Sequence, residues 1–183
     1  LPLRESLSLL YRELADYCEA KYSMLTQHAD PEKALPPLLV RQQKAVDLIT
    51  QCYQQMHMLS AHRNNDYKRL LRAFQEALDL QEHISVSLHQ PEEVQKLVER
   101  SHAEQVIRWN ARTVAERLRV LADDILYHRL PTRFSMEKQI GTLEKIANQH
   151  PDNPVGQFCY WHFSRIARVL RTQRPLYARD LMA

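Results

Sequence analysis

The residue pairs of this sequence that could bind a metal all join an acid to a histidine at helical spacing. Glu99 and His102 form an E-x-x-H pattern, which places a carboxylate and an imidazole on one face of a helix. Di-iron helical bundles use two such pairs and two further glutamates, and the second pair is missing here. Two i,i+4 pairs could hold a metal weakly: Asp79 with His83, and Asp124 with His128. Charge-rich helices produce such pairs by chance, so we expect solvated or structural pairs and no metal.

A cysteine and a histidine near the carboxyl end raise the question of nucleophilic catalysis. Cys159 and His162 lie three residues apart beside Trp161. A Cys–His nucleophile needs a third, orienting group and an oxyanion donor, and the sequence supplies neither in a recognisable pattern. We expect a core thiol and a half-buried imidazole. With Cys18 and Cys52, the cysteines are odd in number and far apart, which favours buried reduced thiols in a reducing compartment.

The scarcity of glycine excludes most nucleotide-dependent enzymes. Only Gly141 and Gly156 occur among 183 residues. A P-loop or a dinucleotide-binding fingerprint needs several glycines at fixed spacing, so neither can be written. Since no catalytic or metal-binding set is recognisable either, we predict no cofactor and no enzymatic activity.

Two tryptophans could stack on a base or on a ligand. Trp109 and Trp161 both fall inside helical patterns. Aromatic side chains on bundle helices more often act as core residues or interface anchors, and we expect that role here.

The strongest local signal is a cluster of arginines in the last 30 residues. On a helical wheel, Arg165, Arg168 and Arg171 fall on one side, and Arg174 follows them. The apolar side chains of the same segment fall on the other side. This basic stripe could be a solvated face, a contact to anionic lipid head groups or a contact to another subunit. The net charge is only +3 and no recognition motif accompanies the stripe, so we expect no nucleic-acid partner.

These residues must be positioned by helices, because apolar side chains recur every three to four residues along the chain. The predicted helices run over about 3–25, 37–61, 67–88, 91–129, 135–149 and 155–172, and the fourth is a single long helix or breaks near 99–104. We expect Leu39, Val46, Ile49, Tyr53 and Met56 to form the apolar stripe of the second helix. Prolines, among them Pro31 and Pro36, should interrupt the chain before it.

Short loops between such helices predict one all-α domain over 1–183, an antiparallel bundle of about five to seven helices.

Three stretches of the chain resemble a known family. They are "PLRESLSLLYRELADYCEAKYS", "LDLQEHISVSLHQPEEVQKL" and "HPDNPVGQFCYWHFSRIARVLRTQRPLYARDLM". Together they resemble the soluble region of the YccS/YhfK family of bacterial inner-membrane proteins, which are similar to fusaric-acid-resistance proteins. The resemblance covers essentially the whole chain and brings no catalytic signature with it.

The resemblance implies a cytoplasmic helical domain that lies between two groups of membrane helices. The chain would then be a fragment of a longer transporter-like protein that exports small organic or aromatic anions. Its expected role is non-enzymatic assembly or regulation of the membrane part. The expected partners are the membrane-embedded parts of the same polypeptide, a second copy of the chain and an anionic lipid surface. The alternative is a free-standing cytosolic helical protein that binds a partner or a metal.

Overall fold

The computed structural model describes residues 2–26, 31–59, 61, 64–86 and 91–182, and only the backbone at 31, 91 and 172–182. All regular structure in these ranges is α-helical, which confirms the predicted fold class. The helices are α1 (Leu3–Thr26), α2 (Pro31–Leu59), α3 (Asn65–Ser85), α4 (Pro91–Arg100), α5 (Ala103–Leu126), α6 (Glu137–Gln149) and α7 (Pro154–Met182).

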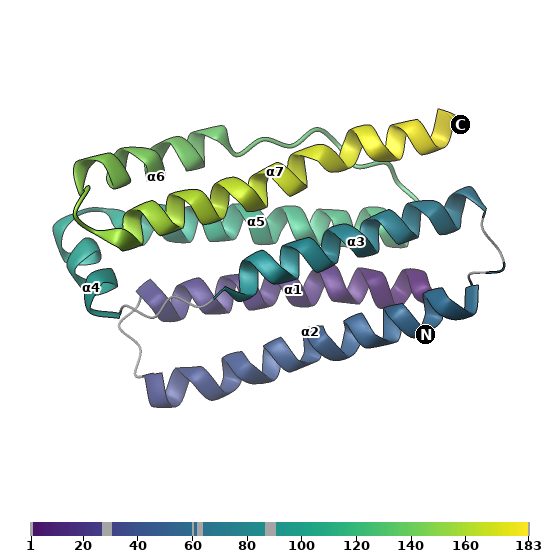
Figure 1. Ribbon diagram of the computed structural model, residues 1–183, viewed down its shortest axis with the longest axis horizontal. Helices are drawn as coiled ribbons and strands as arrows, with labels where there is room; N and C mark the ends of the chain where they lie inside the picture. Colours follow the sequence, from purple (N-terminus) through teal and green to yellow (C-terminus); the bar gives the residue numbers. More distant parts are fainter. Residues whose placement is uncertain (1, 27–30, 60, 62–63, 87–90, 183) are drawn as a thin grey trace.

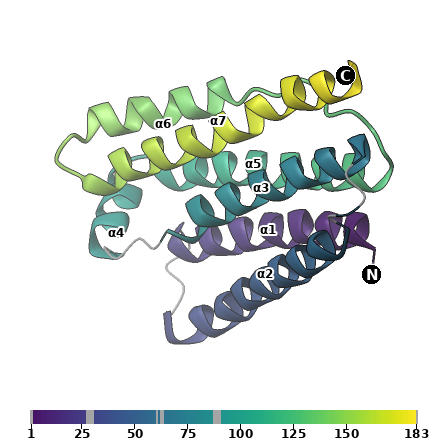
Figure 2. The same ribbon diagram turned by 45° about the vertical axis from the view of Figure 1, so that its right-hand side comes forward.

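The long helices lie roughly parallel to one long axis, and neighbours in the chain run in opposite directions (Figure 1). Helix α1 occupies the centre and contacts α5, α2 and α3. Helices α6 and α7 cover the side of the bundle opposite α2, as both views show (Figures 1 and 2). Because α1 touches these three helices and also α4, apolar side chains are buried on most of its circumference, including Leu7, Tyr11 and Leu14.

Polar side chains inside the bundle bind backbone carbonyls of neighbouring helices. Ser8 Oγ donates to the carbonyl of Ala122 at 2.8 Å, and the Tyr11 hydroxyl donates to that of Ala73 at 2.7 Å. A buried hydroxyl without such a partner would destabilise the core. These two bonds therefore fix α1 against α5 and α3 as well as satisfying the hydroxyls.

The break within the predicted fourth helix is real. Helix α4 ends at Arg100 and α5 begins at Ala103. Between them, Ser101 Oγ accepts a hydrogen bond from the amide of Ala103 at 3.2 Å. A serine that bonds the local backbone in this way competes with helix continuation. The third helix was predicted to end at about Leu88, which lies outside the described residues, whereas α3 ends at Ser85 and the backbone of Val86 is no longer helical.

The predicted start of the second helix was wrong. Helix α2 begins at Pro31 and includes Pro36 and Pro37. Each proline removes one backbone donor, and the carbonyls left without one belong to Glu32 and Lys33. Both of these residues are exposed, so water can satisfy the carbonyls and the helix tolerates the prolines.

The predicted core stripe of α2 was also largely wrong. Leu39, Val46 and Tyr53 are 52%, 39% and 67% exposed. The residues that directly precede these three in the sequence are buried instead. They form a second row of Leu38, Ala45 and Cys52, with Met56. The two rows are adjacent on the helix, and contact with α1 buries the second. On α3, Leu78 follows Leu71 and Phe74 at helical spacing but is likewise exposed, at 37%.

Candidate functional site

The basic stripe on α7 exists as the helical wheel predicted. Arg165, Arg168 and Arg171 are exposed. The apolar residues of the same helix are buried against the bundle: Cys159, Phe163, Ile166 and Leu170. The side chain of Arg174 lies outside the described residues. The geometry of the stripe follows from α7 having neighbours, α3 and α6, on one side.

Two of the arginines border a groove between α6 and α7. Arg168 and Arg171 line its α7 wall, and Glu137 and Glu144 line its α6 wall. The groove has a volume of about 280 Å³. A Cβ placed on Gly141, which also lines it, would meet nothing within 4 Å. The groove is therefore an open, shallow surface with opposite charges on its two walls.

The third arginine borders a separate hollow of about 240 Å³. Arg165 lies there with His83, Trp161 and His162. Trp161 is 60% exposed, so it is a surface aromatic residue and not part of the core. Trp109, on α5, is 41% exposed.

His162 is the buried member of this hollow. It is 5% exposed and stacks on Phe158 with ring centroids 5.3 Å apart. Its Nε2 atom has no hydrogen-bond partner among the described residues. Burial, together with the nearby charge of Lys21, lowers the pKa of His162 to about 3. The imidazole is therefore neutral at physiological pH.

A buried lysine lies beside the same hollow, which the sequence analysis did not identify. Lys21 Nζ donates to the carbonyls of Ile84 and Val86 at the end of α3. Burial lowers the pKa of Lys21 to about 8. The ammonium satisfies carbonyls that a helix end leaves without partners. A lysine in an apolar stretch of α1 was the available signal, but its partners are 63 and 65 residues away.

The Cys159–His162 pair does not have the properties of a catalytic nucleophile. Burial raises the pKa of Cys159 to about 12, so the thiol stays protonated. Cys18 and Cys52 have pKa values raised to about 12 for the same reason. Because the thiolate is the reactive form, these buried thiols are inert at neutral pH.

The structure also separates two of the acid–histidine pairs. Glu99 lies in α4, whereas His102 follows the helix break, so the two do not share a helical face as predicted. His128 lies beyond the end of α5 with a φ of 56°, and Asp124 pairs with Arg129 at 3.5 Å instead.

The third pair, Asp79 and His83, does lie on one helix, α3. Within the described ranges, no three His, Cys, Asp or Glu side chains gather as a metal site requires.

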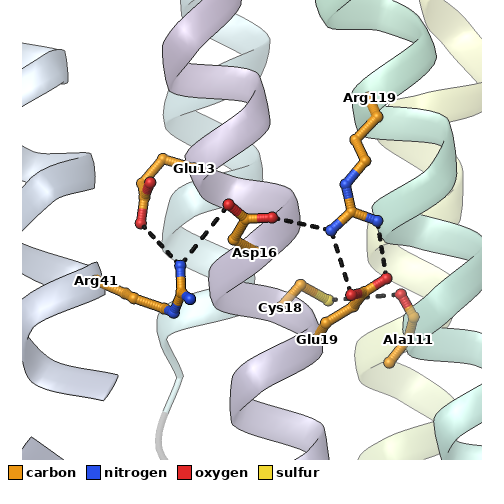
Figure 3. Close-up of polar contacts among 7 residues, drawn as sticks. All are labelled: Glu13, Asp16, Cys18, Glu19, Arg41, Ala111 and Arg119. Carbon is orange, nitrogen blue, oxygen red and sulfur yellow. Dashed lines mark hydrogen bonds and ion pairs between the residues drawn. The ribbon is translucent and has the colours of Figure 1, made fainter. Parts of the chain in front are cut away.

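An ion-pair network ties α1 to α5 and α2 (Figure 3). Arg119 binds Asp16 and Glu19, each with a closest distance of 2.9 Å. On the other side of α1, Arg41 lies 3.7 Å from both Glu13 and Asp16. Hydrogen bonding to Glu19 raises the pKa of Arg119. The sequence analysis missed this network, because its only local signal is a run of acids on α1.

Comparison with known proteins supplies the context for these surfaces. Residues 1–180 match the sequence model of the family described as FUSC-like inner membrane protein yccS. The chain belongs to this FUSC-like family. It is also 92% identical over 182 residues to the uncharacterized protein YhfK of Escherichia coli (strain K12). The match covers 100% of the chain but 26% of YhfK, so the chain spans about a quarter of that relative.

No solved structure matches the chain. Within the described residues, no helix combines the length and apolar character needed to cross a membrane.

Proposed function

We propose that the chain is the cytoplasmic portion of a transporter-like inner-membrane protein that exports small organic anions, including aromatic ones. In this proposal the portion assembles or regulates the membrane part and catalyses no reaction. Membership of a family of inner membrane proteins carries the proposal, because the match extends over residues 1–180. The length of YhfK, of which the chain is 26%, leaves ample polypeptide for the membrane part.

The path of the chain is compatible with attachment on both flanks. The two ends of the described chain lie at the same end of the bundle (Figures 1 and 2). A domain joined to membrane helices at both ends needs both ends to face the membrane. We call the end of the bundle that carries both ends of the described chain the tethered end. The corner after α5, with Tyr127 and Leu130 at 64% and 49% exposure, lies there too.

The basic stripe runs along α7 and therefore along the long axis of the bundle. If the bundle stands on its tethered end, the stripe faces sideways. Arg165, Arg168 and Arg171 are then placed to contact another subunit or another part of the same protein. They would contact lipid head groups only where the stripe comes close to the membrane. Opposite charges on such a partner would give orientation more than raw affinity.

Charge reversal in the full-length protein tests this role. Replacing Arg165, Arg168 and Arg171 together with Glu should reduce the membrane complex on native gels and the efflux of radiolabelled benzoate from cells. Replacing the same three residues with Lys keeps the charge and is the matched control. If the Glu variant assembles and exports like the parent protein, the stripe has no such role.

A further inference from the structure

Helix α2 exposes an apolar surface that the rest of the bundle leaves uncovered. Seven of the fifteen exposed large apolar side chains in the described residues lie on this one helix. Four of them form one row, which we call the outer row: Leu35 (44% exposed), Leu39 (52%), Val46 (39%) and Tyr53 (67%). Exposed apolar side chains gathered on one face of a helix mark an interaction site more often than scattered single residues do.

The spacing of the outer row is that of a helix–helix seam. Leu39, Val46 and Tyr53 are seven residues apart, and Leu35 precedes Leu39 by four. This is the pattern by which two helices pack side by side. The next side chains around the helix include Gln43 and Thr50, which are uncharged, so two copies of this face would not repel each other.

The outer row is held in place from behind. The buried row of α2, Leu38, Ala45 and Cys52, packs into the core. Arg41 reaches Glu13 and Asp16 on α1, at 3.7 Å each (Figure 3). Helix α2 is the outermost helix on its side in both views. The outer row is therefore a fixed surface that faces away from the molecule.

We propose that α2 pairs with α2 of a second copy of this chain, in parallel, through the outer row. The parallel direction of the two helices rests on the proposed function. Two copies attached to one membrane by their tethered ends have their long axes pointing the same way, and a two-fold axis along the membrane normal relates them. Each residue of the outer row then faces its own counterpart, as an isologous interface requires.

Disulfide trapping in the full-length protein, in membrane vesicles, tests the pairing. The variants L39C, V46C and Y53C each place one thiol on the outer row, and the three cysteines of this chain are buried. Gln51 is exposed on another side of α2, so Q51C is the matched control. After mild copper-catalysed oxidation we expect a disulfide-linked dimer from each row variant and none from Q51C. Co-expressed L39C and Y53C should form no mixed dimer.

Several outcomes would overturn the inference. A mixed L39C–Y53C dimer would show antiparallel pairing. Absence of dimer from all three row variants would exclude pairing of α2. Row cysteines shielded from maleimide without any dimer would mean that lipid or another segment covers the row. The further variant V46E should abolish the dimer while leaving the protein in the membrane fraction. Recovery of the parent protein in the soluble fraction would instead contradict the proposed function.

Discussion

At the scale of single residues, burial inside this bundle shifts the pKa values of two basic groups toward their neutral forms. His162 and Lys21 both have lowered pKa values, about 3 and about 8, because burial disfavours their charged states. Lys21 offsets that cost through two backbone carbonyls, whereas Nε2 of His162 has no partner among the described residues. His162 is thus the group whose protonation the folded state resists most directly.

The pKa of His162 predicts an acid-dependent loss of stability. Between its folded-state value of about 3 and its ordinary value of 6.5, the unfolded chain binds a proton that the folded chain does not. The stability present above pH 6.5 is therefore lost as the pH falls toward 3, by at most about 1.4 kcal/mol per pH unit. Urea unfolding across this range measures the loss. The free energy of unfolding of the parent chain minus that of H162F should decrease as the pH falls. Parallel curves for the two proteins would contradict the assignment.

At the scale of elements, the two glycines illustrate how packing decides the effect of a residue. Gly141 lies inside α6, and a Cβ there meets nothing within 4 Å. Gly156 lies in the first turn of α7, and a Cβ there would lie 3.3 Å from the Cα of Ala147. The first glycine only weakens its helix, while the second permits the close approach of α6 and α7.

Alanine at the two positions should therefore have different effects. G141A should raise the free energy of unfolding by about 0.5–1 kcal/mol, because alanine favours a helix interior over glycine. G156A should give a smaller gain or a loss, because the added methyl group presses on the backbone of α6. Urea denaturation of the two variants side by side measures this. Equal stabilisation would show that α6 and α7 are not in close contact there.

At the scale of the whole molecule, the bundle has two unlike ends. The tethered end carries both ends of the described chain and the corner at Tyr127. The other end carries the last residue of α6, Gln149, and the start of α7. Helix α5 alone has 24 residues, which corresponds to a length of about 36 Å. A membrane at the tethered end would therefore be far from Gln149.

Fluorescence quenching can test this orientation in the full-length protein. Y127C and Q149C place a labelling site at each end, and both positions are exposed, whereas the three cysteines of this chain are buried. With nitroxide-headgroup lipids in the bilayer, a dye at position 127 should be quenched more strongly than one at 149. Equal quenching at the two positions would contradict a bundle that stands on its tethered end.

The sequence by itself determined the all-helical character of the chain and the basic stripe, because both depend on local spacing, although it misplaced the start of α2 and the end of α7. Phe163, Ile166 and Leu170 alternate with Arg165 and Arg168 at a period that one helix fixes without help from its neighbours. The break near Ser101 was one of two alternatives that the sequence left open, and the structure decided between them. The family, too, was recognisable from long stretches of sequence, and the match over residues 1–180 confirms it.

Only the tertiary structure decided which apolar row of α2 is buried and which groups have shifted pKa values. Leu38 and Leu39 are sequence neighbours of the same residue type. Contact with α1 buries Leu38, whereas Leu39 stays exposed. The partners of Lys21 lie more than 60 residues away in the chain. Burial and electrostatic environment depend on contacts between elements, and helical periodicity carries no information about which elements meet.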